Sequence, residues 1–501
     1  MTITGNRGLD IEERLIFEQD KPGRTAVDLP EPPAHTNRLG AARRTKPIGL
    51  PGLSEPQVVR HYVRLSRNNY AIDAGIYPLG SCTMKHNPRL NEKMARLPGL
   101  ADLHPLQPMS TVQGALGLME EISRWLTVLT GMPAVALPPA AGAHGELTGL
   151  MAIRAALEAR GNARAVVLVP ESAHGTNPAS AHMCGYRVES IPATERGRVD
   201  MAKLTARLGD DVAAVMITNP NTCGLFEDEI VEMSAAVHKA GAFVYCDGAN
   251  FNAIVGRVRP GDLGIDAMHL NLHKTFSTPH GGGGPGAGPV TLSAALAPFA
   301  PLPYVVRDKA GLRLVEHAAD AADDRKPYGR MKGFHGQFGV FVRALSYMMS
   351  MGSDGLRQAS ADAVLNANYL RARLQGTFSL SYEGPCMHEV LFDDRFLDGT
   401  GVTTLDFAKA MIDEGVHPMT MYFPLIVHGA FLIEPTETES KFTLDQLADL
   451  MLGLAKRAKA GEANGFKQAP TLSPRRRLDE TRAARNPVLR WRPAEPAKAA
   501  E

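Results

Sequence analysis

Cysteine is scarce in this sequence, and the way the few cysteines are placed excludes two kinds of site. Five occur in 501 residues, namely Cys82, Cys184, Cys223, Cys246 and Cys386. They are odd in number and widely spaced, and no pair has the C-x-x-C spacing of a zinc site. We therefore expect neither a disulfide framework nor a metal site, and we expect a reducing, cytoplasmic location.

An excess of one charge and long apolar runs are also missing. The net charge is +1, which gives no general reason to expect a nucleic acid or a membrane as partner. No apolar run is long enough to cross a bilayer. Early acidic residues (Asp10, Glu12, Glu13 and Glu18) argue against a secretory signal or a transit peptide. A hydrophobic content of 44% with 21% charged residues predicts a soluble globular protein of more than one domain.

Two catalytic signatures are incomplete. Residues 280–284 (His-Gly-Gly-Gly-Gly) look like an oxyanion-hole motif, but no Gly-x-Ser-x-Gly nucleophile turn accompanies them. No glycine run continues into Gly-Lys-Ser or Gly-Lys-Thr. A serine hydrolase and a P-loop nucleotide site are therefore unsupported.

Composition divides the chain into four parts. Prolines recur between positions 22 and 56, which blocks regular structure and predicts an extended arm over residues 1–60. Residues 61–335 alternate apolar strands with helices and predict a large α/β domain with a mostly parallel, doubly wound sheet. The pattern of residues 336–464 predicts linking helices and a smaller C-terminal α/β domain. Residues 465–501 are rich in Pro and Arg, which favours a docking arm or a disordered tail.

Polar clusters follow the strands predicted in the large domain. Strands are expected at 165–169, 186–191, 212–217, 242–246 and 267–272, with a further one at 288–292. The clusters are His174 with Thr176, Asn219 to Thr222, Asp247 with Ala249, and His273 with Lys274. Ligands of doubly wound sheets bind beyond the carboxyl ends of the strands, so we expect the clusters at one rim. Taken singly, each is also explained by turn chemistry, and a lone lysine after a strand is usually a solvated surface residue.

The residue types at this rim suit pyridoxal phosphate. The amine of Lys274 can hold an aldehyde cofactor as a Schiff base. Asp247 is placed to keep the ring nitrogen protonated, and the imidazole of His174 can stack on the ring. Asn219 or Thr222 can bond the phenolic oxygen.

A phosphate site is expected at a helix start. Small residues at 140–145 precede a helix predicted from about Glu146 to Glu158. Such a start leaves backbone N–H groups approachable at the positive end of the helix dipole. Small residues also begin many helices that bind nothing, so this feature alone is weak.

Five longer motifs carry a resemblance to a known family. They occupy residues 78–85 (PLGSCTMK), 139–146 (PAAGAHGE), 171–178 (ESAHGTNP), 271–276 (NLHKTF) and 434–440 (EPTETES). Together they resemble the pyridoxal-phosphate P-protein family of the glycine cleavage system, over about residues 60 to 445.

The resemblance implies a fold, a cofactor and site residues. It implies a fold-type I pyridoxal-phosphate enzyme with Lys274 as imine lysine, His174 as stacking residue and Asp247 as ring-nitrogen partner. It places the phosphate near Ala141, Gly142 and Ala143. Because the chain resembles the second half of longer P-proteins, the resemblance also implies the split form. In that form two copies of this chain pair with two copies of a homologous subunit 1 that lacks the lysine.

The resemblance also implies a reaction, that of an aminomethyl-transferring, decarboxylating glycine dehydrogenase. Glycine loses CO2, and its aminomethyl group passes to the lipoyl arm of the H-protein. The lipoyl arm needs a channel, for which residues 77–86 and 417–424 are candidates, although both are equally explained as packed loops. The glycine run 281–286 is expected to be a close-approach loop at the cofactor phosphate or a subunit interface.

Two other interpretations stay open at this point. Another fold-type I enzyme acting on glycine or serine would share the lysine, the aspartate and the histidine. A non-catalytic scaffold subunit is the second, and the retention of Lys274 together with Asp247 argues against it.

Overall fold

The computed structural model describes residues 13–492, apart from positions 32, 35, 37, 47, 282–285 and 474. The chain forms two compact units, one of residues 72–467 and one of the described residues of 1–71 and 468–501. The division into four parts that the composition predicts stays a prediction. Within the described residues, no helix is both long and apolar enough to span a membrane.

The unit of the two termini contains a helix with a clear start signal. Helix α1 (Glu55–Arg67) begins after Ser54, which forms a capping box with Gln57. Its buried His61 lies 2.9 Å from the carboxylate of Glu13. Apart from a short 3-10 helix at Gly40–Ala42, the described residues between 21 and 54 form no regular helix or strand, as the prolines predict. A short helix, α14 (Glu480–Arg485), belongs to the same unit.

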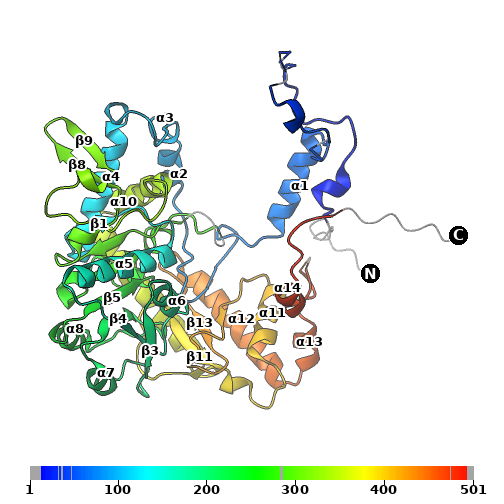
Figure 1. Ribbon diagram of the computed structural model, residues 1–501. Helices are drawn as coiled ribbons and strands as arrows, with labels where there is room; N and C mark the ends of the chain where they lie inside the picture. The colour runs from blue at the N-terminus through cyan, green and yellow to red at the C-terminus, as the bar shows by residue number, and fades with distance from the viewer. Residues whose placement is uncertain are drawn as a thin grey trace. The chain divides into compact units, whose positions relative to one another are not determined.

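The larger unit, drawn in Figure 1, is built on a seven-stranded sheet. The order of its strands is β1-β7-β6-β5-β4-β2-β3. The strands are β1 (Ala134–Ala136), β2 (Val166–Pro170), β3 (Arg187–Ile191), β4 (Val212–Thr218), β5 (Phe243–Gly248), β6 (Ala267–Leu270) and β7 (Val290–Leu292). Strands β3, β2, β4, β5 and β6 are parallel, while β7 runs antiparallel to both β6 and β1. The prediction of a doubly wound, mostly parallel sheet is confirmed. Strand β1, which was not predicted, is too short to show a pattern.

The central strands are mostly apolar because helices cover both faces of the sheet, and polar residues occur at their carboxyl ends. Every residue of β2, β4 and β5 is buried. The surrounding helices are α2 (Arg89–Ala95), α3 (Pro98–Ala101), α4 (Gln113–Thr130), α5 (Gly142–Ala159), α6 (Thr176–Met183), α7 (Met201–Arg207), α8 (Ile230–Lys239) and α9 (Leu272–Thr275). Helix α5 approaches the sheet closely, since a Cβ on Gly149 would lie 2.5 Å from Tyr245 Cε2. That approach fixes the start of α5 over the ends of β5 and β6.

The rest of the larger unit lies after a β8–β9 hairpin (Tyr304–Asp308 and Gly311–Val315). Helix α10 (Phe338–Leu374) bends at Gly352, which has a φ of 64°. It leads to an antiparallel sheet of order β10-β11-β13-β12. Its strands are Ser379–Leu380, Val390–Asp393, Phe431–Ile433 and Thr420–Met421, accompanied by α11 (Thr404–Asp413), α12 (Lys441–Lys459) and α13 (Ala463–Gln468). A cluster of phenylalanines, centred on Phe378, packs beneath this sheet.

Candidate active site

A cavity of about 270 Å³ opens beyond the carboxyl ends of the parallel strands. Eight of the ten site residues predicted from the sequence line it: Gly142, Ala143, His174, Thr222, Asp247, Ala249, His273 and Lys274. Ala141 and Asn219 are not among its lining residues. The rest of the lining includes Ser81, Cys82, Glu146, His269, Asn271 and His280. The rim expected from the positions of the strands is therefore one site in space.

Lys274 lies in the cavity and not on the solvated surface. The strand before it ends at Leu270, and the lysine sits on the single helical turn α9. Its side chain is half-buried, and Nζ donates a hydrogen bond to the carbonyl oxygen of Ser81 at 2.9 Å. The polar turn thus points the amine back over the end of the sheet.

Asp247 supplies a buried negative charge opposite the lysine. One of its oxygens accepts a hydrogen bond from Ala249 N at 2.9 Å and lies 3.3 Å from His269 Nε2. The other nitrogen of His269 lies 2.6 Å from the hydroxyl of Tyr245. Burial lowers the pKa of His269, so its imidazole is neutral. The tautomer with hydrogen on Nε2 satisfies both neighbours and orients the carboxylate.

Glu146 was not singled out from the sequence as a site residue, although it lies within the 139–146 motif. It is buried, and it accepts hydrogen bonds from the hydroxyls of Thr176 (2.8 Å) and Ser180 (3.0 Å). Burial, followed by the charge of Asp247, raises the pKa of Glu146 to about 7. Only the fold brings this helix residue next to Asp247, so sequence spacing carried no signal of the pair.

The start of α5 fits an anionic group. Ala141 is its N-cap residue, and its side chain accepts no hydrogen bond from the first turn. Among the described residues, the N–H groups at this helix start therefore have no side-chain cap and can donate to a ligand. A Cβ on Gly142 would lie 2.6 Å from Asn271 Nδ2. The backbone is therefore accessible only because this residue has no side chain. Helix α5 begins at Gly142, earlier than the sequence predicts.

The ring of His174 and the hydroxyl of Thr222 occupy different places in the site. His174 is exposed at the edge of the cavity, with Nδ1 2.8 Å from Thr176 Oγ1 and Phe423 against its edge. The hydroxyl of Thr222 donates to the carbonyl of Ser172. Asn219 is buried behind the cavity, and its Oδ1 accepts from Glu227 N at 3.1 Å.

Cys82 lies in the cavity as a neutral thiol. Its sulfur is 3.2 Å from Nε2 of His280. Burial raises the pKa of the Cys82 thiol and lowers the pKa of the His280 imidazole, so neither group is ionised by the other at neutral pH. Cys82 is therefore part of the cavity wall, where burial disfavours its thiolate form.

The loops proposed to line a channel can be placed only in part. The ring of Tyr77 stacks on that of His417, with centroids 3.8 Å apart, so the two candidate segments meet. The close-approach prediction for 281–286 falls mainly on residues 282–285, which lie outside the described residues. Next to them, a Cβ on Gly286 would lie 2.9 Å from His273 Nδ1.

Comparison with known proteins identifies the family. A family model described as glycine dehydrogenase, C-terminal domain, matches residues 359–471, and one described as aminotransferase class-V matches residues 148–284. The probable glycine dehydrogenase (decarboxylating) subunit 2 of Caulobacter vibrioides is 67% identical over 98% of this chain and 94% of its own length. The protein of the same name from Exiguobacterium sibiricum is 51% identical over 96% of this chain and 98% of its own. This chain belongs to the glycine dehydrogenase (decarboxylating) subunit 2 family.

Solved structures share the fold of this family member. A glycine decarboxylase (P-protein) of the glycine cleavage system in inhibitor-bound form has a TM-score of 0.69 at 21% identity, covering 82% of this chain and 92% of that one. Oryza sativa TDC with PLP and tryptamine has a TM-score of 0.63 at 13% identity, covering 85% of this chain and 92% of that one. The family and the fold class predicted from the sequence are both confirmed, and pyridoxal phosphate is the cofactor that fits them.

Proposed function

We propose that this member of the family decarboxylates glycine with pyridoxal phosphate held at Lys274. One observation carries the proposal. In a chain of this family, a lysine amine, a buried aspartate and an uncapped helix start converge on one cavity. Those are the three groups that the aldehyde, the ring nitrogen and the phosphate of the cofactor require.

Each predicted site residue then has a part in holding the cofactor. Lys274 binds the aldehyde, Asp247 faces the ring nitrogen, and His174 offers the free face of its imidazole to the ring. When bound, the cofactor supplies an electron sink for the carbanion left by loss of CO2. The protein supplies the orientation.

The remaining predicted residues support this arrangement from the edges. Gly142 and Ala143 offer backbone N–H groups to the phosphate, and Ala141 sets the start of their helix. Thr222 and Ala249 bound the ring site. Asn219 lies behind the cavity, where its Oδ1 accepts a hydrogen bond from Glu227 N, and His273 lies beside Gly286. Glycine has no side chain, so a small cavity is the natural means of excluding larger amino acids.

Partners follow from the family name and from the resemblance. We propose that the chain assembles with the homologous subunit 1, as two copies of each. We also propose that the aminomethyl group passes to the lipoyl arm of the H-protein. The contact between Tyr77 and His417 brings the two candidate channel segments together, which supports an entrance near them.

Exchange of label between bicarbonate and the carboxyl group of glycine tests the function directly. The assay combines this chain, subunit 1 and lipoylated H-protein. We expect exchange with wild type and a loss of it with Lys274→Ala. A folded, cofactor-loaded wild-type complex that catalyses no exchange would contradict the proposal.

A further inference from the structure

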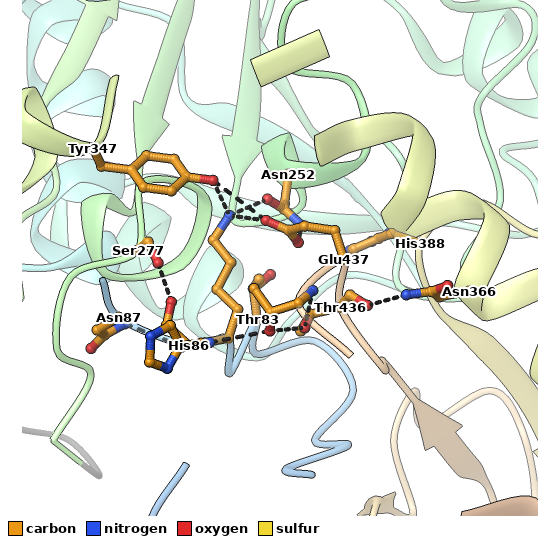
Figure 2. Close-up of polar contacts among 12 residues, drawn as sticks. Thr83, His86, Asn87, Asn252, Ser277, Tyr347, Asn366, His388, Thr436 and Glu437 are labelled. Atoms are coloured by element: carbon orange, nitrogen blue, oxygen red, sulfur yellow. Dashed lines mark hydrogen bonds and ion pairs between the residues drawn. The ribbon is translucent and has the colours of Figure 1, made fainter. Parts of the chain in front are cut away.

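The segment that carries Ser81, residues 79–87, is anchored by a buried lysine. The ammonium of Lys85 donates to Glu437 Oε1 at 2.6 Å, to Asn252 Oδ1 at 2.8 Å and to the Tyr347 hydroxyl at 3.3 Å (Figure 2). These acceptors lie in the 434–440 motif, in the segment after β5 and in α10. All three hydrogens of the ammonium are used, so Lys85 fixes the segment without serving the cavity.

Further hydrogen bonds hold the same segment on both sides of Ser81. The hydroxyl of Thr420 donates to the carbonyl of Gly80 at 2.7 Å, and that of Thr83 donates to Glu434 Oε1 at 2.5 Å. The hydroxyl of Ser277 donates to the carbonyl of His86 at 2.5 Å (Figure 2). Residues 79–87 therefore form a fixed wall and not a mobile lid.

Within this wall, Ser81 has an unfavourable backbone conformation. Its φ is 63°, in the left-handed region that L-residues other than Asn and Asp rarely adopt. Its N–H donates to Glu389 Oε2 at 2.7 Å, and its carbonyl accepts from Lys274 Nζ at 2.9 Å. The carboxyl group and the lysine thus bind opposite ends of one residue.

Glu389 acts on Ser81 by position and not by charge. Its side chain is fully buried, and Asn250 Nδ2 lies 3.4 Å from its second oxygen. Burial, followed by the nearby Glu434, raises the pKa of Glu389 well above its ordinary value. A neutral carboxyl group still accepts a hydrogen bond, so Glu389 can hold Ser81 without being a counterion for Lys274.

We propose that the carbonyl of Ser81 is the resting point of the Lys274 amine whenever that amine is not joined to the cofactor, and that Glu389 is the positioning residue that holds the carbonyl there. The inference rests on the proposed function, in which Lys274 is the cofactor lysine. Without Glu389, Ser81 is free to relax from its left-handed conformation, and its carbonyl turns away from the amine.

The hydrogen bond between Lys274 and Ser81 affects the binding of cofactor and of glycine in opposite directions. The amine of Lys274 is free in the cofactor-free protein and again when glycine has replaced it on the cofactor. The hydrogen bond to Ser81 therefore stabilises both of these states but not the state between them, in which Lys274 is joined to the cofactor. Weakening it must tighten the binding of pyridoxal phosphate and weaken the binding of glycine by the same factor.

Variants at Glu389 test this demand in the full-length chain with its partner subunit. Glu389→Leu removes the acceptor, Glu389→Asp withdraws it by one methylene, and Glu389→Gln keeps an acceptor of the same size. Thr420→Val is the matched control, because it removes another anchor of the same segment. Two equilibrium constants are measured by absorbance, one for pyridoxal phosphate and one for glycine.

We expect opposite shifts of about tenfold in the two constants for Glu389→Leu and Glu389→Asp, the size expected when one hydrogen bond is lost. Glu389→Gln and Thr420→Val should stay within about twofold of wild type. If Glu389→Leu does not fold, Glu389→Asp decides. Affinities that fall together, or that do not change, overturn the proposal.

Failure of the proposed function has a separate signature. Borohydride reduction of the wild-type holoenzyme should link the cofactor to the peptide that contains Lys274. If the cofactor is linked to another residue, the function assigned to Lys274 is wrong, whatever the Glu389 variants do. If it is linked to Lys274 but the two affinities do not shift in opposite directions, only the role of Ser81 and Glu389 fails.

Discussion

Glu146 and Asp247 share one amide. With the nitrogen of Asn177 turned toward the two acids, it lies 3.1 Å from Asp247 Oδ2 and 3.2 Å from Glu146 Oε2. The two carboxyl groups come from helix α5 and strand β5, about a hundred residues apart in the chain. This close approach is part of the reason that the pKa of Glu146 is raised to about 7.

The first prediction concerns stability against pH. The pKa of Glu146 rises from 4.5 to about 7 on folding, so the folded protein binds more protons between these values. The contribution of Glu146 to stability is therefore lost as the pH rises through this window. In the cofactor-free protein, Glu146→Gln should gain thermal stability relative to wild type at pH 8 but not at pH 4.5.

Thermal unfolding followed by circular dichroism at several pH values measures this effect. Glu158→Gln, also on α5 but half-exposed, is the control and should show no such trend. A difference between wild type and Glu146→Gln that does not vary with pH would contradict the raised pKa.

The second prediction concerns Asp247. Asp247→Asn keeps the size of the side chain but removes the charge proposed to face the ring nitrogen. Cofactor should still bind Lys274, while kcat for glycine–bicarbonate exchange should fall by roughly 100-fold or more, as for other preorganised electrostatic groups. Asp200→Asn, at the cap of α7 and outside the cavity, should retain activity. Near-normal turnover in Asp247→Asn would refute the assigned role.

The third prediction concerns the start of α5. A Cβ on Gly142 would lie 2.6 Å from Asn271 Nδ2 and 3.1 Å from His269 Nε2. We therefore expect Gly142→Ala to bind pyridoxal phosphate at least about tenfold more weakly, since crowding moves the N–H donors proposed for the phosphate. The control is Gly453→Ala on α12, which meets nothing within 4 Å. It should bind cofactor normally and gain up to about 1 kcal/mol of stability. Fluorescence titration of the cofactor-free proteins decides between these outcomes.

The fourth prediction concerns the buried pair of Lys85 and Glu437. Their side chains are 1% and 7% exposed, so Lys85→Met leaves an unpaired buried carboxylate. The free energy of unfolding should fall by roughly 3–5 kcal/mol in urea titrations. Lys441→Met breaks the more exposed ion pair with Asp445, and it should change the free energy of unfolding little. Equal effects of the two substitutions would show that burial does not decide the contribution of the ion pair.

Sequence pattern alone determined the parallel part of the fold. Strands buried on both faces are apolar up to their carboxyl ends, so β2, β4 and β5 are visible as apolar runs that end in polar residues such as Thr218 and Asp247. The polar turns after these strands then fall at one rim, which is why the sequence suffices to group Lys274, Asp247 and His174. Strand β1 escaped prediction because its three residues are too few to show a period.

Only the tertiary structure decided which groups act on Lys274 and Asp247. Glu146, Ser81 and Glu389 reach the site from a helix, a wall segment and the end of a second sheet, and no local pattern records such contacts. The protonation of Glu146 and Glu389 depends on burial and on neighbours that folding brings together, which raise the pKa of both carboxyl groups. The sequence by itself predicted that Lys274 and Asp247 share one site, since motif and strand order place both at the same rim, and the two residues line one cavity. The hydrogen bond between Lys274 and Ser81 joins residues far apart in the chain, so it comes from the fold alone.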